Sequence, residues 1–450
     1  MRSTRTACSI RARCFRSCTA APSSGRCTST TASFRFPTFL VSEAPPPVDV
    51  QVRPADESEL IDAIRGLTAA GTPAQVNGAG TKQRFGRPVN AAATLQLDGL
   101  TGIEAYAPDE LTLTCGAGTS LATVESLLRE HDQELAFEPP DLGPLYGEPA
   151  GGATIGGVLG CNLAGSRRVR AGGARDHFLG FRAVSGRGEA FKAGGHVVKN
   201  VSGYDLCKLL AGSFGTLAAL SEVTVKVLPR AVRTGTLLLP GRSVDDAVGL
   251  LIAAWQSRLE PSGLGCVPPE IAPLLPPGLP ADAGCIAAIR FEGPEGSVLD
   301  RIARMRERLG GASLQLGDAE SRAVWKAITD AAPFADSASV QAERPLWRLS
   351  LPPAAAAGVI DRLVGRPGGM WLLDGGMLWF APTGDASASA AVRAETERVG
   401  GAATLLRAPP SVRAAEGVFP RQSDGIERIA AAIRFGFDPA GVLNPGRMGA

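Results

Sequence analysis

The pattern of apolar and polar positions predicts alternating strands and helices over the first half of the chain. Short apolar or alternating runs predict strands at 50–52, 74–77, 94–97, 111–115, 178–184 and 217–228. A helix is predicted after Asp56, because Leu60, Ile64 and Leu67 follow at helical spacing and Glu59 can complete a capping box. Another helix is predicted after Thr119 or Ser120. This order predicts an α+β or α/β architecture.

The second half repeats the alternation with longer helices. Helices are predicted at 243–255, 297–309, 354–364 and 386–399, and strands at 285–291, 347–351 and 403–406. A hairpin is predicted at 370–381, with its turn at 374–376, and the stretch 268–280 is a proline-rich loop. This order suits a ferredoxin-like sheet. A last helix after Ser423, with Ile426, Ile429 and Ile433 on one face, would return the chain to the first domain.

Composition separates an unusual N-terminal stretch from the rest of the 450 residues. Residues 1–45 hold seven Arg and one acid, Glu43, in a Ser/Thr-rich background without a continuous apolar run. We interpret them as a disordered leader, either transit-like or translated from a start codon assigned too far upstream. The remainder holds 39 basic and 43 acidic residues. This balance excludes a nucleic-acid-binding stripe, and no apolar run is long enough to span a membrane.

The cysteines do not suggest a metal centre. Four of the nine lie in the leader, and the other five, at 115, 161, 207, 266 and 285, are scattered singly without neighbouring His. This spacing argues against a zinc or iron–sulfur site and favours reduced, buried thiols of a cytoplasmic protein.

Glycine is concentrated where the chemistry is expected. The loop Gly78–Gly86 follows a strand and begins Gly-x-Gly-Thr, so successive N–H groups can form an anion nest beside Lys82. A plain glycine turn is the alternative; the loop fits neither a Rossmann fingerprint nor a P-loop. In 151–165 two Gly-Gly pairs flank Thr154, which suits either a helix start against a phosphate or flavin, or ordinary close packing. Of the arginines that follow, Arg170 is the best candidate to face a ligand.

Assembled in order, these motifs resemble the PCMH-type FAD-binding domain of the vanillyl-alcohol oxidase superfamily. The resemblance covers about 48–229 and returns at Gly441–Arg447; Lys199-Asn200, Gly203–Leu206 and Gly212–Thr216 are typical of its lactate and glycolate branch. It implies a fold of two α+β halves holding FAD, followed by a smaller ferredoxin-like α+β cap. The residues that it implies as FAD contacts are Gly78, Ala79, Gly80, Thr81, Lys82, Gly86, Pro140, Asp141, Gly152, Thr154, Ile155, Gly156, Gly157, Asn162, Gly165, Arg170, Glu222, Val223 and Asn444.

Histidine is where the chain departs from that superfamily. Covalent members attach the flavin to a His of the first loop, where this chain has Thr81 and Lys82, so we expect non-covalent FAD. Catalytic members of the branch carry a His-rich motif in the cap. Here no His follows His196, so we expect no metal site and assign no catalytic residue. The short cap most resembles the smaller FAD-binding subunits of glycolate oxidases.

That resemblance implies a subunit of a multi-subunit oxidase of glycolate or another 2-hydroxy acid, partnered by a larger FAD-binding subunit and an iron–sulfur subunit. Its FAD would relay electrons or serve assembly, and membrane association would arise only through partners. One alternative is a self-sufficient FAD oxidoreductase for D-lactate, another hydroxy acid or an alcohol, using Tyr204 or Arg348, although Tyr204 is better read as a buried packing residue. The intact glycine loops argue against a structural subunit that has lost FAD. The expected domains are the leader 1–45, the FAD-binding domain 46–230, the cap 231–420 and a returning segment 421–450.

Overall fold

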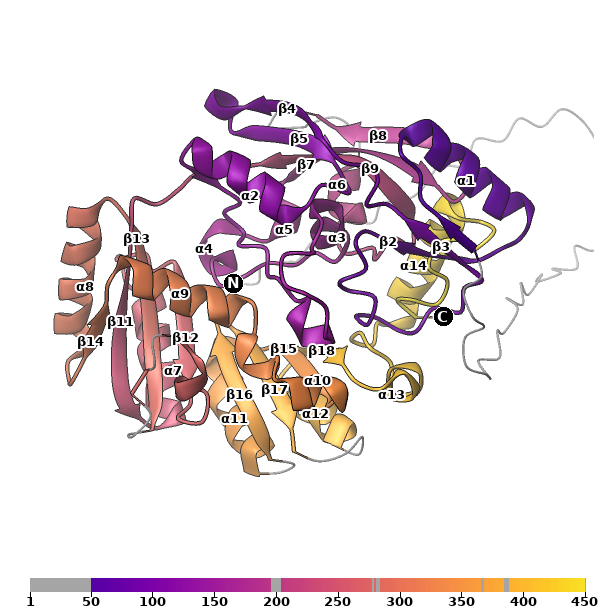
Figure 1. Cartoon of the computed structure of the whole chain (residues 1–450). Helices are drawn as coiled ribbons and strands as arrows, with labels where there is room; N and C mark the ends of the chain where they lie inside the picture. The colour runs from indigo at the N-terminus through magenta and orange to yellow at the C-terminus, as the bar shows by residue number, and fades with distance from the viewer. Residues whose placement is uncertain are drawn as a thin grey trace, which may run out of the picture. The chain divides into compact units, whose positions relative to one another are not determined.

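The computed structural model describes residues 50–195, 204–276, 279–280, 284–365, 368–383 and 388–449. The expected leader, His196 and the motif residues Lys199, Asn200 and Gly203 lie outside these residues. The described chain forms three sheets of three or more strands with helices packed on them (Figure 1). The α+β class is therefore confirmed.

A small parallel sheet opens the fold. Its strands β1 (Val50–Val52), β3 (Ala93–Gln96) and β2 (Ala74–Asn77) lie in the order β1-β3-β2. Helix α1 (Glu57–Ala69) begins at Asp56, whose carboxylate accepts from the N–H of Glu59 at 2.9 Å. Leu443, near the C-terminus, pairs in parallel with Ala74 and is buried in the core of this sheet. The end of the chain therefore completes the first half of the fold.

The second half is an antiparallel sheet in the order β4-β5-β9-β7-β8. Its strands are β4 (Ile103–Ala107), β5 (Thr112–Gly116), β7 (Phe178–Ser185), β8 (Ala190–Gly194) and β9 (Ala218–Lys226). Its helices are α2 (Leu121–Glu130), α3 (Ile155–Gly160), α4 (Arg168–Ala171), α5 (Ala174–His177) and α6 (Leu206–Leu210). The short strands β6 (Gln133–Glu134) and β10 (Leu228–Pro229) pair separately.

The following region builds an eight-stranded antiparallel sheet in the order β14-β11-β13-β12-β16-β17-β15-β18. Its strands are β11 (Arg233–Arg242), β12 (Gly263–Val267), β13 (Cys285–Gly293), β14 (Leu314–Leu316), β15 (Leu346–Ser350), β16 (Gly369–Asp374), β17 (Met377–Pro382) and β18 (Ala402–Arg407). Its helices are α7 (Val244–Trp255), α8 (Glu295–Leu309), α9 (Asp318–Thr329), α10 (Ser337–Gln341), α11 (Ala356–Gly365) and α12 (Ala388–Glu397).

This sheet consists of two β-α-β-β-α-β units joined through β12 and β16. The first unit contains α7 and α8, and the second contains α11 and α12. A ferredoxin-like arrangement was predicted, and the structure contains it twice. The first strand of this sheet, β11, begins at Arg233, close to the boundary expected between residues 230 and 231.

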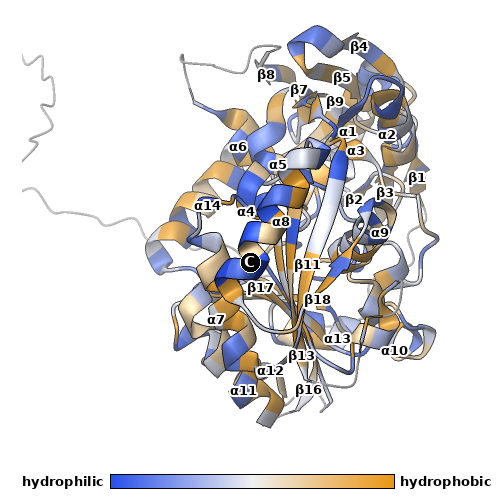
Figure 2. Ribbon diagram, turned by 90° about the vertical axis from the view of Figure 1, so that its left-hand side faces the viewer, coloured by the Kyte–Doolittle hydropathy of each residue, from blue (hydrophilic) through white to orange (hydrophobic). Residues whose placement is uncertain are grey.

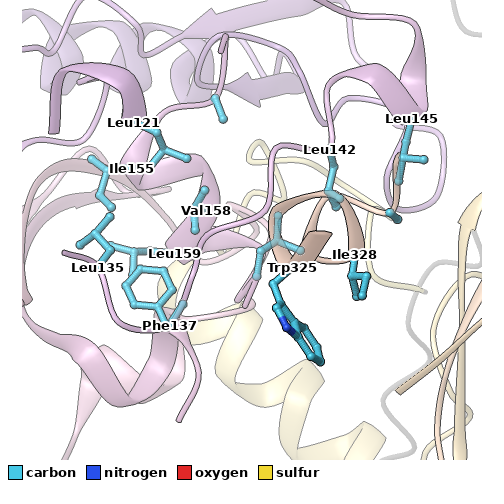
Figure 3. Close-up of a cluster of buried hydrophobic side chains, with 14 of the residues drawn as sticks. Leu121, Leu135, Phe137, Leu142, Leu145, Ile155, Val158, Leu159, Trp325 and Ile328 are labelled. Carbon is cyan, nitrogen blue, oxygen red and sulfur yellow. The ribbon is translucent and has the colours of Figure 1, made fainter. Parts of the chain in front are cut away.

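The two faces of the large sheet have different partners. One face packs on α7, α8, α11 and α12 in a core that includes Leu251, Ile302, Ile360 and Val392. The strands are mainly hydrophobic, whereas α8 carries many polar residues (Figure 2). The other face shares a core with the second half of the fold and with Trp325 and Ile328 of α9 (Figure 3). We call the large sheet with its helices the cap.

Buried charges also join the cap to the second half. Arg290 of β13 is 2% exposed and binds Glu138 through two N–H groups, at 2.7 and 2.9 Å. Arg167 contacts Glu134 and Glu138 of the second half and Glu292 of the cap. Because each buried charge has an opposite partner, this network can form away from water.

Two further helices, α13 (Pro410–Ala415) and α14 (Asp424–Phe437), precede the C-terminal strand-like segment. No residue of α14 is buried, and Ile426, Ile429 and Phe435 are more than half exposed. The predicted helix is therefore present, but Ile426 and Ile429 of its predicted apolar face are left exposed by the described residues, whereas Ile433 is partly buried.

Candidate functional site

The loop after β2 packs directly on the start of α3. A Cβ atom at Gly78 would lie 2.4 Å from Oγ1 of Thr154, so only glycine permits this approach. Thr154 caps α3, and its Oγ1 accepts from the N–H of Gly157 at 3.2 Å. At Gly80 the backbone has φ +79°, which also favours glycine. The two glycine-rich stretches therefore meet, as their resemblance implied.

The glycines of α3 bring it close to the second sheet. Gly156 donates to the carbonyl of Ala117 at 2.9 Å, and a Cβ there would lie 2.7 Å from that oxygen. At Gly157 a Cβ would lie 3.6 Å from Nζ of Lys82. The backbone of α3 therefore stands beside the Lys82 ammonium without an intervening side chain.

The C-terminal segment is held to both stretches by one amide. Oδ1 of Asn444 accepts from the N–H of Val76 at 2.9 Å, and its Nδ2 donates to the carbonyls of Phe214 at 2.8 Å and Val76 at 3.3 Å. The side chain is 3% exposed. Asn444 therefore connects β2, the turn before β9 and the C-terminus through backbone bonds.

These segments surround a cleft of about 780 Å³, counted to its open mouth. The cleft is lined by Val76, Asn77, Gly78, Ala79, Gly80, Thr81, Lys82, Gln83, Leu97, Ala117, Thr154, Gly156, Gly157, Gly160, Cys161, Ser213, Phe214, Gly215, Ala218, Leu220, Asn444 and Arg447. Nine of the expected contacts are therefore brought together here: Gly78, Ala79, Gly80, Thr81, Lys82, Thr154, Gly156, Gly157 and Asn444.

The cleft is cationic. Nζ of Lys82 donates to Oγ1 of Thr81 at 3.0 Å, and burial lowers the pKa of this lysine despite the opposing effects of Cys161 and Asp141. Burial likewise lowers the pKa of Arg447 to about 10. Among the described residues, neither cation has an acidic group within ion-pair distance.

Two polar nitrogens of the cleft lack partners among the described residues: Nδ2 of Asn77 and Nε of Arg447. Buried donors of this kind are uncommon in folded proteins, and a bound ligand can satisfy them. The cations, the orphaned donors and the exposed glycine backbone together fit an elongated ligand with anionic groups, such as a dinucleotide.

A second group of expected contacts supports the cleft from outside. Gly86 packs against Arg447, where a Cβ would lie 2.7 Å from Nε, and Gly152 packs against Thr81. The carboxylate of Asp141 accepts from the N–H groups of Gly151 at 2.7 Å and Gly143 at 3.2 Å, so it braces the loop that begins at Pro140.

The remaining expected residues do not line the cleft. Ile155 and Val223 are buried in the core, and Gly165 packs on Thr329 of the cap helix α9. Asn162 is exposed, with its Oδ1 accepting from the N–H of Arg175, and Glu222 lies on β9 opposite Gly116. The prediction that Arg170 faces the ligand is wrong, because its guanidinium pairs with Glu260 of the cap at 2.7 Å on the surface.

Sequence reasoning missed several lining residues. Gln83 lies between expected contacts, and Cys161 follows α3. Ser213, Phe214 and Gly215 belong to a motif that the sequence analysis quoted without assigning contacts, and Arg447 ends the C-terminal motif. Treating each whole motif as a lining segment would have found Ser213, Phe214, Gly215 and Arg447.

The two residues considered for independent catalysis differ. Tyr204 is 93% exposed, so the expectation that it is buried is wrong. Arg348 of β15 is partly buried, near Cys161 and Tyr146. The described histidines lie elsewhere: His131 ends α2, and the ring of His177 bonds the carbonyl of Ala171 at 2.9 Å. Within the described ranges no group of three or more His, Cys, Asp or Glu could hold a metal ion.

Comparisons with known proteins agree with this geometry. A family model described as an FAD binding domain matches residues 48–194. Glycolate oxidase subunit GlcE of Escherichia coli is 34% identical over 88% of this chain and 99% of its own length. Glycolate oxidase subunit GlcD of Bacillus subtilis is 25% identical over 76% of each chain, and a D-lactate dehydrogenase of Archaeoglobus fulgidus is 30% identical over 47% of this chain and 45% of its own.

Solved structures show the same fold at low identity. Alkyldihydroxyacetonephosphate synthase superposes with a TM-score of 0.65 at 16% identity, over 88% of this chain and 75% of that one. 4-Ethylphenol oxidase from Gulosibacter chungangensis superposes with a TM-score of 0.61 at 12% identity, over 89% and 88%. The cleft therefore lies in a PCMH-type FAD-binding fold, its cofactor is FAD, and the chain belongs to the family of the glycolate oxidase subunit GlcE.

Proposed function

We propose that this chain is the FAD-binding subunit of a multi-subunit enzyme that oxidises glycolate to glyoxylate. The observation that carries the proposal is the cleft around Lys82 and Arg447, with its orphaned donors and bare glycine backbone. Relatives named as the GlcE and GlcD subunits of glycolate oxidase support the substrate and the presence of partner subunits. We further propose a larger flavin subunit and an iron–sulfur subunit as the partners.

FAD supplies the two-electron acceptor for the oxidation, and the protein supplies binding and orientation. Nest-like N–H groups at Gly78–Thr81 and the Lys82 ammonium would hold phosphate oxygens. Arg447 would place a positive charge beside the cofactor, with its Nε available as a donor. Asn444 holds β2, the turn before β9 and the C-terminal segment together around the cleft. The core shared with the cap excludes water on one side.

Binding would be non-covalent. The loop 78–86 contains no His, and neither His131 nor His177 lines the cleft. Acid precipitation of the protein should therefore release all the flavin into the supernatant. Yellow colour that stays with the precipitated chain would contradict this.

The sheets support the proposed domain division. Residues 46–230 and 421–450 would form the FAD-binding domain, and 231–420 would form the cap. None of the helices in the described ranges has the length and apolarity needed to cross a bilayer. We propose a cytoplasmic protein that reaches a membrane only through partners.

The test is to purify the full chain together with its partner subunits. We expect one FAD per chain by its absorbance band near about 450 nm, which is a property of oxidised flavin. Glycolate-dependent reduction of an electron acceptor should require this subunit. A colourless chain, or full glycolate activity of the complex without it, would refute the proposal.

A further inference from the structure

The face of the cap sheet that turns toward the FAD-binding half carries an unusual polar row. In β17, Leu378 and Phe380 pack into the core beneath the helices, whereas Trp379 belongs to the core shared with the second sheet. Side chains alternate along a strand, so Arg348, which pairs with Trp379, lies on this same face. Its neighbours Trp347 and Leu349 pack on the helix side.

Arg348 is a cation without a partner among the described residues. No hydrogen bond or ion pair of its side chain occurs in the described part of the chain, whereas the nearby Arg168 bonds Asp374 at 3.1 Å. Arg407 of the neighbouring strand β18 is satisfied by carbonyl oxygens, including that of Phe334 at 2.9 Å. A desolvated guanidinium without a counter-charge is unfavourable unless a ligand supplies one.

The pKa of Arg348 also indicates that no negative charge lies beside its guanidinium. Burial and the positive charge of Arg168 lower its pKa to about 10, and no carboxylate within the described ranges opposes them. The opposing groups are Tyr146 and Cys161, both neutral at physiological pH. The local environment therefore lacks the negative charge that this side chain would favour.

An orphaned donor lies next to it. The indole of Trp379 is 5% exposed, and its Nε1–H has no partner in the described structure. The comparable Trp325 donates its Nε1–H to Oγ1 of Thr236 at 2.8 Å. Trp347 also lacks a partner for its N–H, but it lies on the other face, where Arg393 stacks on its ring. Arg348 and Trp379 therefore offer donors side by side on the face toward the flavin half.

Cys161 connects this row to the FAD cleft. Cys161 lines the cleft beside Lys82 and Arg447. It also lies close enough to Arg348 for the positive charge of the guanidinium to lower the pKa of the thiol. Burial raises the pKa of Cys161 although all three cations oppose this. Arg348 retains partial exposure, so a small molecule can reach it.

We propose that Arg348, with the N–H of Trp379, binds the carboxylate of a small 2-hydroxy acid at the cap end of the FAD cleft. A guanidinium presents a planar fork of donors that matches a carboxylate, and it does not require the histidines that this chain lacks. The inference rests on the proposed function and deepens it. It places a substrate site on this subunit itself rather than on its partners alone.

The experiment is a titration of the full-length, FAD-loaded chain with oxalate, a two-carbon dicarboxylate that lacks a hydride to give. The flavin absorbance is followed at fixed ionic strength. We expect a saturable spectral change for the wild type and binding about 10- to 100-fold weaker for Arg348→Met, because charge-assisted hydrogen bonds are lost. Arg348→Lys should fall between them. Trp379→Phe should weaken binding about 5- to 10-fold, since it removes only the N–H.

The controls separate binding from folding. Arg362→Met, which changes an arginine of α11 that pairs with Glu395 of α12, should bind oxalate as the wild type does. Arg348→Met should keep its FAD content and should not melt at a lower temperature, because it replaces an unpartnered, partly buried charge by an apolar side chain.

Three results would overturn the inference. One is unchanged oxalate binding by Arg348→Met. Another is a wild-type chain that holds FAD but shows no response to oxalate; the proposed flavoprotein function would then stand without this site. The third is a lowered flavin reduction potential in Arg348→Met with oxalate affinity intact, which would assign the guanidinium to the flavin itself. A wild-type chain without FAD would instead refute the proposed function.

Discussion

Replacement of Asn444 by alanine should destabilise the protein even when no FAD is bound, because its side chain binds backbone groups of the chain itself. The amide makes three bonds to backbone groups of Val76 and Phe214 and is almost fully buried. Alanine would leave the N–H of Val76 and the carbonyl of Phe214 unsatisfied, at about 1–3 kcal/mol for each group. The residue also has φ +45°, which asparagine tolerates better than alanine by about 1 kcal/mol. The expected loss of unfolding free energy is about 3–7 kcal/mol.

Asn162→Ala is the matched control. Asn162 has φ +49°, nearly the same backbone conformation, but it is exposed and its side chain accepts one bond, from the N–H of Arg175. It should lose only about 1–2 kcal/mol. The difference between the two variants isolates the buried bonds of Asn444.

The assay is chemical denaturation of the FAD-free chain, compared with FAD affinity of each variant. Asn444→Ala should unfold at lower denaturant than Asn162→Ala even without FAD. If the two variants unfold alike and Asn444→Ala only binds FAD less well, the side chain acts on the cofactor. The proposed stabilising role of its three backbone hydrogen bonds would then be wrong.

Three further outcomes are expected. Burial alone would raise the pKa of Glu292, but Arg290 and Arg167 outweigh this effect and hold the pKa at about 2. The lowered pKa contributes at most about 3 kcal/mol to the free energy of unfolding at neutral pH. This contribution is lost as the pH falls from about 4.5 toward 2. Denaturation against pH should show this loss in the wild type and a flatter curve in Glu292→Gln. Lys82→Met should weaken FAD binding about 10- to 100-fold, measured by flavin fluorescence, because an ammonium beside the phosphates is removed. Ile429→Glu should keep FAD but weaken co-purification with the larger flavin subunit, since the exposed apolar face of α14 suits a protein partner; unchanged co-purification would exclude that face.

The motifs that could be read from the sequence are those whose geometry is local. Gly78 and Gly80 stand in a loop of a few residues, and Thr154 caps the helix that follows it, so residue type and spacing alone indicate their positions. Helices with clear apolar spacing, such as α1 and α8, were predicted for the same reason. The strand β12 was missed because Gly-Leu-Gly-Cys-Val has little β propensity of its own and is stabilised by its neighbours β13 and β16.

The errors arose where a role depends on a distant partner. Arg170 is close in sequence to the cleft, but its charge is taken by Glu260, which no local pattern connects to it. Ile155 and Val223 stand beside true lining residues, yet their side chains turn into the core. Arg447 reaches the cleft only because the C-terminus pairs with Ala74, a contact across most of the chain.

The missing histidines therefore have a narrower meaning than the sequence suggested. They leave the cap without histidine ligands and without an imidazole base, but recognition of a hydroxy acid begins with its carboxylate, and carboxylates are bound by cations. The cap supplies such a cation in Arg348, held without a counter-charge on the face toward the flavin half. A subunit that served only to relay electrons could use that cation only to tune its flavin, and an apolar residue there would otherwise be more stable. The Arg348→Met variant thus compares the two roles directly: a pure relay shows no change in its response to oxalate, although its flavin potential can shift, whereas a substrate-binding subunit loses its affinity for carboxylates.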